Sequence, residues 1–112
     1  MTSDVGAQLR KGVVEYCILG LLEREPMYGW TLSEALVSRK MIASIGTLYP
    51  VLTRLRAQGL VTTYDELSES GRARKYYRLT EDGTLQLKSF RQQWEPFTTT
   101  VQELVGKGIP HD

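Results

Sequence analysis

The sequence predicts a mainly α-helical fold with one β-hairpin, and three observations lead to this fold class. Apolar residues recur at helical spacing in three short segments between residues 11 and 59. Residues 60–79 are rich in β-branched and aromatic side chains and are interrupted by a glycine-containing turn, which is typical of a hairpin. After residue 80, apolar residues recur every three or four positions along a long final helix.

Size and charge restrict the kind of protein this can be. The chain has 112 residues and a net charge of +1, so a case for nucleic-acid binding must rest on local basic clusters. Cys17 is the single cysteine, which excludes an intramolecular disulfide. The polar N-terminus lacks the apolar core of a signal peptide, and the longest apolar run is too short to span a bilayer. We expect an intracellular, cytoplasmic protein with no membrane partner.

The first helix is expected from about Lys11 to Arg24, after a polar segment, Met1–Gln8, that we expect to be loose. Pro26 ends this helix, because proline pushes the residue before it away from helical geometry. A second helix is expected from Gly29 to Ser38. The apolar faces of the two helices are expected to be Val14, Cys17, Ile18, Leu21 and Leu22, and Leu32, Ala35 and Leu36.

The third helix lies within Ser44–Gly59, where Gly59 occupies a C-terminal cap position. Its inward positions are Leu48, Val51, Leu52 and Leu55. The sequence allows two N-cap positions for this helix. If Thr47 is the N-cap, Pro50 lies in the first turn, where its missing N–H has no cost. If Ser44 is the cap, Pro50 loses one bond to Gly46, and the start should be distorted or of 3₁₀ type.

The hairpin is expected to consist of a strand over Leu60–Glu69, a turn over Ser70–Ala73 and a returning strand over Arg74–Leu79. A two-stranded hairpin is marginal alone, so it must pack on the helices. Thr80 caps the final helix, with Glu81 and Asp82 in its first turn. The order predicts a winged helix-turn-helix DNA-binding domain over residues 9–79 and a C-terminal dimerisation helix over residues 80–106.

The third helix carries no acidic residue between Ile45 and Gly59. Its outward positions are Thr47, Tyr49, Thr53, Arg54 and Arg56. Basic and hydroxyl groups of this kind suit phosphates and base edges, and in a helix-turn-helix the second helix enters the major groove. The alternative is a solvated amphipathic helix, which would normally mix both charge signs.

The hairpin is polarised in charge. Its tip and returning strand hold Arg72, Arg74, Lys75 and Arg78 without an acid, whereas the preceding strand holds Asp65, Glu66 and Glu69. Basic side chains on a hairpin tip can reach phosphates or enter a minor groove. The alternative is a solvated strand edge on which charge prevents aggregation.

The last helix has an apolar seam at spacings of three and four: Leu87, Phe90, Trp94, Phe97, Val101 and Leu104. The seam predicts a homodimer; the alternative is that the helix folds back on its own domain. Pro96 lies inside it, and because the apolar phase continues beyond, we expect a kinked helix. Phe90, Trp94 and Phe97 of two subunits would wall a flat cavity for a small aromatic effector, or would simply pack.

Catalytic residue sets are missing from the sequence. His111 is the single histidine and lies in the tail, Cys17 lies on an apolar face, and neither a zinc-binding cluster nor a phosphate-binding glycine loop is present. We therefore expect no enzyme activity, no metal and no cofactor.

Four stretches together resemble the PadR family of bacterial transcriptional regulators: "LRKGVVEYCILGLL", "MYGWTLSEAL", "SIGTLYPVLTRLRAQGLV" and "SGRARKYYRLTEDG". The short C-terminal part resembles the subfamily with one long dimerisation helix. The resemblance implies a homodimeric repressor that binds a palindromic operator in double-stranded DNA and is released by a small aromatic compound. It also favours Ser44 as the cap of the third helix.

The resemblance implies DNA contacts at the start of the third helix, at the start of the second helix and on the wing. With the residues named above, the expected DNA-binding set is Lys11, Tyr28, Gly29, Ser44, Gly46, Thr47, Tyr49, Arg54, Arg72, Arg74 and Lys75. Trp94 falls where related drug-binding members carry an aromatic residue of the ligand pore, and Pro96 departs from the family pattern. A winged-helix module that binds protein and no DNA remains the alternative, and the sequence leaves repressor and activator open.

Overall fold

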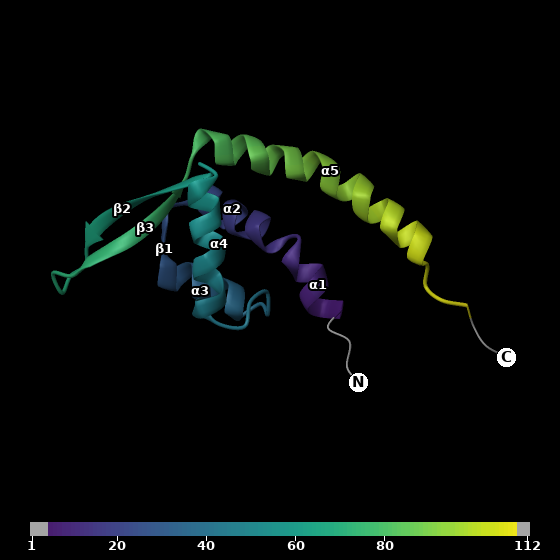
Figure 1. Ribbon diagram of the computed structural model, residues 1–112, viewed down its shortest axis with the longest axis horizontal. Coiled ribbons are helices and arrows are strands. Elements are labelled where there is room, and N and C mark those ends of the chain that lie inside the picture. The colour runs from purple at the N-terminus through teal and green to yellow at the C-terminus, as the bar shows by residue number, and fades with distance from the viewer. Residues whose placement is uncertain (1–4, 110–112) are drawn as a thin grey trace.

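The computed structural model describes residues 5–109 and confirms a mainly helical chain with a small antiparallel sheet (Figure 1). Within this range the elements are α1 (Val5–Lys11), α2 (Val14–Arg24), β1 (Met27–Tyr28), α3 (Gly29–Val37), α4 (Ile45–Ala57), β2 (Val61–Leu67), β3 (Ala73–Leu79) and α5 (Glu81–Val105). His111 lies outside the described residues.

The N-terminal region differs from the expectation. Residues 1–4 lie outside the described range, but Val5–Gln8, expected to be loose, belong to α1. The expected single helix over Lys11–Arg24 is two helices, because the chain turns at Gly12 and Val13 before α2 begins. The end of α2 is as predicted: Glu25 is extended ahead of Pro26.

The core lies between α2, α3, α4 and the inner face of the sheet. Ile18, Leu32, Leu48 and Leu55 are fully buried there. Leu19 is also fully buried, although the helical spacing did not include it. Cys17, Leu21 and Ala35 were expected on inner faces and are half-buried.

The sheet has three strands in the order β1-β3-β2, because Met27 and Tyr28 pair antiparallel with Tyr77 and Tyr76. The sequence did not indicate β1, because a strand of two residues shows no alternation. Its pairing with β3 stabilises the hairpin. Alternation along β3 then places Tyr77 on the inner face and Tyr76 on the outer face.

The helix α4 begins at Ile45 with Ser44 as its N-cap, which decides between the two starts considered above. The Thr47 N–H donates to the Ser44 carbonyl, three residues back, at 3.1 Å, so the first turn has the expected 3₁₀ character. Pro50 lies inside the helix, which continues to Ala57. Gly59 has φ +75° and follows the helix as its left-handed cap.

A junction of four residues holds the start of α5 against the end of α4. The Thr80 hydroxyl donates to the Gly59 carbonyl at 2.7 Å and accepts from the Gly83 N–H at 3.0 Å. The Thr80 N–H donates to the Leu60 carbonyl at 3.1 Å. Thr80 therefore caps α5, as predicted, and also ties α5 to the chain that leaves α4.

The helix α5 runs without a break from Glu81 to Val105, so Pro96 does not end it. Its first half packs on α2, and its second half projects away from the other elements (Figure 1). The chain measures 67 × 33 × 21 Å, and its radius of gyration is 17.1 Å, whereas a compact chain of this length has about 13 Å. Among residues 5–109, no helix combines the length and apolar character needed to cross a membrane.

We predict that Gly83→Ala destabilises the protein by about 2 kcal/mol or more, because added volume in a packed site forces the backbone to shift. A Cβ at Gly83 would overlap the Leu60 carbonyl oxygen and lie 2.6 Å from the Leu79 Cδ1. The measurement is urea unfolding at a fixed protein concentration.

The matched control is Gly20→Ala in α2, where a Cβ meets nothing within 4 Å. Alanine is the better helix former, so this variant should gain about 0.5–1 kcal/mol. Equal stability of the two variants would contradict the junction described above.

Candidate nucleic-acid interface

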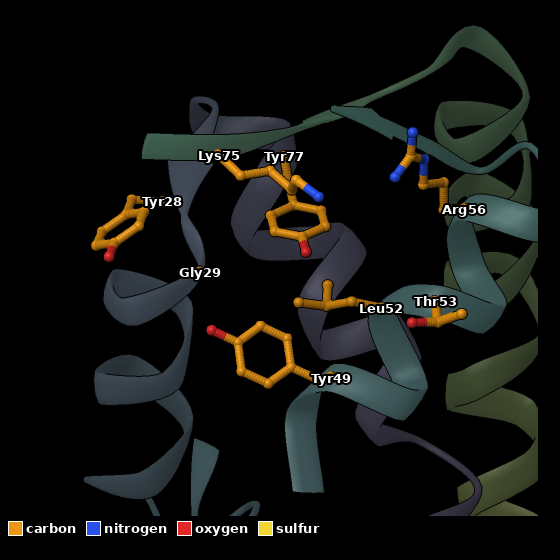
Figure 2. A pocket seen from close by; sticks show the side chains of 8 residues that line it. All are labelled: Tyr28, Gly29, Tyr49, Leu52, Thr53, Arg56, Lys75 and Tyr77. Atoms are coloured by element: carbon orange, nitrogen blue, oxygen red, sulfur yellow. The ribbon is translucent and has the colours of Figure 1, made fainter. Parts of the chain in front are cut away.

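A pocket of about 390 Å³ lies between α4, the start of α3 and the inner face of β3 (Figure 2). Four of the expected DNA-binding positions, Tyr28, Gly29, Tyr49 and Lys75, come together there, although they belong to separate elements. The lining residues are Tyr28, Gly29, Tyr49, Leu52, Thr53, Arg56, Lys75 and Tyr77.

Two tyrosines and a glycine form one side of this pocket. A Cβ built on Gly29 would lie 3.6 Å from the Tyr77 ring and 3.8 Å from the Tyr49 hydroxyl, so both side chains reach the first residue of α3. Tyr77 is 8% exposed, whereas Tyr49 is 48% exposed. Burial raises the pKa of the Tyr77 hydroxyl above its ordinary value near 10, which keeps it protonated and able to donate.

Two cations line the pocket, Arg56 from α4 and Lys75 from β3, and no acidic residue lines it. Within residues 5–109 the ion pairs are Arg54–Glu15 and Arg91–Glu23, which leaves both pocket cations without an acidic partner. Asp65 lies opposite Lys75 in the β2–β3 register without forming such a pair. The pocket therefore presents two cations that form no ion pair within the described chain.

Arg54 was expected to face DNA, and the structure turns it toward α2. Its guanidinium donates to the Glu15 carboxylate at 3.2 Å, and half of its side-chain surface stays exposed. It lines a separate groove of about 410 Å³ together with Lys11 and Thr47. Lys11 at the end of α1 thus lies near the start of α4. This position is consistent with a contact from Lys11 to a phosphate of DNA that is bound at α4.

The start of α4 is exposed. Ser44, Gly46 and Thr47 all lie on the surface, and the Ser44 side chain forms no capping hydrogen bond. Their polar groups are consequently open to a partner that approaches the N-terminal turn of the helix.

The basic residues of the wing are divided between two faces of β3. Lys75 lies on the inner face with Tyr77, whereas Arg74 and Arg78 lie on the outer face with Tyr76. On that outer face the Arg74 guanidinium lies 5.1 Å from the centre of the Tyr28 ring. Arg78 stacks over Tyr64 in the same way at 4.8 Å. Arg72 belongs to the turn at the hairpin tip.

The seam of α5 divides at Trp94. Leu87 is 3% exposed and belongs to the chain's own core, so it presents almost no surface to a second chain, contrary to the expectation. Phe90 is half-buried and stacks on Tyr16 of α2 with ring centres 4.1 Å apart. The remaining seam residues, Trp94, Phe97, Val101 and Leu104, are exposed.

A second pocket, of about 690 Å³, lies beside this seam, where Phe90, Trp94 and Phe97 line it from α5. Pro96 of α5 also lines this pocket, and Leu9 and Val13 line it from the N-terminal region. The sequence pointed to the three aromatic residues but not to Leu9 or Val13. The i, i+4 spacing of those two residues is the sequence signal that indicates this apolar wall.

Neither metal chemistry nor a reactive thiol has support in the described residues. No group of three or more metal-ligating side chains occurs in the range 5–109. Burial raises the pKa of the Cys17 thiol, which disfavours the nucleophilic thiolate.

Comparison with known proteins finds similarity to transcriptional regulators in sequence and structure. The profile of the transcriptional regulator PadR-like family matches residues 18–89. Transcriptional regulator Rv3488 of Mycobacterium tuberculosis is 32% identical over 94 residues, which cover 84% of this chain and 87% of that regulator.

Two crystal structures extend the similarity to the fold. A PadR family transcriptional regulator from Eggerthella lenta matches with a TM-score of 0.82 and 32% identity, over 94% of this chain and 92% of that one. A PadR-like transcriptional regulator from Bacillus cereus matches with a TM-score of 0.79 and 38% identity, over 91% of this chain and 99% of that one. The helices, the wing and the C-terminal helix thus form the winged-helix fold of these regulators.

Proposed function

The chain belongs to the PadR-like family of transcriptional regulators, and we propose that it is a homodimeric repressor that binds a palindromic operator and is released by a small aromatic compound. Family membership gives regulation of transcription through DNA. The dimer, the operator symmetry, the repression and the effector are our proposals.

The observation that carries the proposed DNA interface is the pocket between α4, the start of α3 and β3, whose lining contains no acidic residue. Thr47 is exposed in the first turn of α4, where a helix-turn-helix contacts base edges. Lys75 and Arg56 add charge from two elements without an acidic partner in the described chain. We assign base contacts to the start of α4 and phosphate contacts to its flanks.

The exposed half of α5 supports a homodimer. Trp94 is 41% exposed and Phe97 60%, and both lie on a seam that projects beyond the rest of the chain (Figure 1). Large apolar side chains in a regular seam are stabilised by a second helix that covers them. We therefore place the dimer contact beyond Phe90. The boundary between a DNA-binding domain that ends at residue 79 and a dimerisation helix that begins at residue 80 stays a prediction.

The proposed dimer supports a palindromic operator, and repression is a further part of the proposal. A two-fold dimer presents two copies of α4, which match two inverted half-sites. A protein bound across both half-sites within a promoter would exclude the polymerase, and this is how we propose that it represses.

The pocket of about 690 Å³ supports the proposed aromatic effector. Phe90, Trp94 and Phe97 offer ring faces, and Leu9 and Val13 offer an apolar wall, which suits a flat apolar molecule. An occupant that spreads the two copies of α5 would change the separation of the two copies of α4 and release the DNA. The fluorescence of Trp94 in a Trp30→Phe background would report occupancy of this pocket.

We predict that the protein binds a duplex from immediately upstream of its own coding sequence more tightly than a random duplex of equal length. Both affinities should fall as salt rises, because basic side chains displace counterions from the phosphates. Equal affinity for the two duplexes, with no dependence on salt, would refute the repressor and favour a protein-interaction module. Fluorescence anisotropy measures all of these affinities.

Variants then separate base contacts from phosphate contacts in the same assay. Thr47→Ala should change the preference among single-base variants of the bound site, with losses of about 1–3 kcal/mol at the affected position. Lys75→Ala should weaken all duplexes alike. Arg74→Ala, on the outer face of the wing, should lose less than Lys75→Ala. Uniform losses for all three variants would refute base reading by α4.

We predict that Trp94→Ala raises the dissociation constant of the dimer about tenfold or more, because buried tryptophans dominate interface energies. Sedimentation equilibrium measures this constant. Leu85→Ala is the matched control: Leu85 is 59% exposed on α5 but lies off the seam, so its loss should have no effect. An unchanged constant for Trp94→Ala would remove the seam from the interface.

A further inference from the structure

We propose that the pocket between α4 and the wing holds one phosphate group of the DNA backbone, bound by Tyr77, Arg56 and Lys75. This inference rests on the proposed DNA binding and names the partner group of one part of that surface. The sequence indicates Arg56 only as an outward residue of the third helix, and it gives no DNA-binding role to Tyr77.

The Tyr77 hydroxyl points to a ligand. The side chain is more than nine-tenths buried, and its hydroxyl points into the pocket (Figure 2). Within the part of the chain that the structure describes, no hydrogen bond involves this hydroxyl. No side-chain N or O atom in the described chain is both buried and without a partner, so the hydroxyl oxygen itself is open to the pocket. It can therefore donate to an acceptor that enters from outside.

The charge around the pocket selects an anion. Arg56 comes from α4 and Lys75 from β3, and no acid lines the space between them. The nine-residue helix α3 begins at Gly29, and its N-cap, Tyr28, provides no side-chain hydrogen bond to its free N–H groups. These N–H groups lie at the positive end of the helix dipole, which adds to the attraction for an anion.

A phosphate of the DNA backbone fits the position of the pocket better than a free anion does. Tyr49 and Thr53 line the same pocket and lie on the exposed face of α4, so a strand beside the helix would pass over its mouth. A backbone phosphate held on one side by α4 and on the other by Lys75 would fix the angle between recognition helix and wing. Arginine and lysine commonly hold phosphates in this way.

The first test uses two single variants, one that removes a hydroxyl group and one that removes a positive charge. Tyr77→Phe should weaken binding to the upstream duplex and to the random duplex about tenfold, since a hydrogen bond to a charged group is lost. Arg56→Gln should weaken both duplexes and reduce the slope of log affinity against log salt by about one. Both variants should keep the wild-type ratio between the two duplexes, because a phosphate contact carries no sequence information.

Matched controls come from the outer face of the same strand. Tyr76→Phe and Arg78→Gln remove the same groups there. Tyr76→Phe should leave both affinities unchanged, and Arg78→Gln should weaken them less than Arg56→Gln does. Thermal unfolding of Tyr77→Phe should match the wild type, which excludes a folding defect. If sequence preference persists and Tyr77→Phe and Arg56→Gln bind like the wild type, this inference fails while the proposed function stands. Loss of sequence preference in the wild type would refute the proposed function itself.

The second test neutralises the phosphate. A set of duplexes carries one methylphosphonate per half-site, at a different position of the strand in each duplex. At one position the substitution should lower the affinity of the wild type but leave the affinity of Tyr77→Phe unchanged. Additive losses at every position would overturn the inference. Inorganic phosphate alone, titrated up to millimolar concentrations, should leave the amide resonances of Gly29 and Tyr77 unchanged. Submillimolar binding there would instead identify a site for a free phosphate compound.

Discussion

The contact of Gly83 with the Leu60 carbonyl is the constraint on which the rest of the structure depends. Leu60 follows the cap of α4, and Thr80, which caps α5, also donates to the Gly59 carbonyl. A side chain at Gly83 would push α5 away from the end of α4. The orientation of the C-terminal helix relative to the proposed recognition helix is therefore fixed at one short junction, where no flexible linker intervenes.

This junction explains how one small chain could combine DNA binding with dimerisation. Leu87 and Phe90 anchor the first half of α5 to the domain, and the exposed seam begins at Trp94, one turn later. A partner that packs on the second half of α5 would thus set the distance between the two copies of α4. The pocket beside Phe90 and Trp94 lies where the anchored and the exposed parts of α5 meet, so an occupant there would act on that distance.

The sequence predicts those features whose causes are local. Pro26 and Gly59 end helices, Thr80 starts one, and their effects reach only a few residues along the chain. What the sequence missed depends on distant partners. The strand β1 exists only because Met27 and Tyr28 meet β3, some fifty residues later.

The candidate site shows the same limit. The acid-free composition of α4 indicated its exposed face, but spacing alone could not show that Glu15 draws Arg54 toward α2. Nor could it show that Arg56 shares a pocket with Lys75 and Tyr77, because that depends on how the hairpin packs against α4. Adjacent residues of a strand such as Lys75 and Arg74 lie on opposite faces, but only the packing shows which face lies against the helices.

In the proposed complex, two copies of α4 at a fixed separation bind two inverted half-sites. Hydroxyl-radical footprinting on the DNA upstream of the coding sequence measures this arrangement. We expect two protected patches, symmetric about a dyad and separated by a whole number of helical turns of about 10.5 base pairs each. A single patch, or even protection without a dyad, would contradict this arrangement.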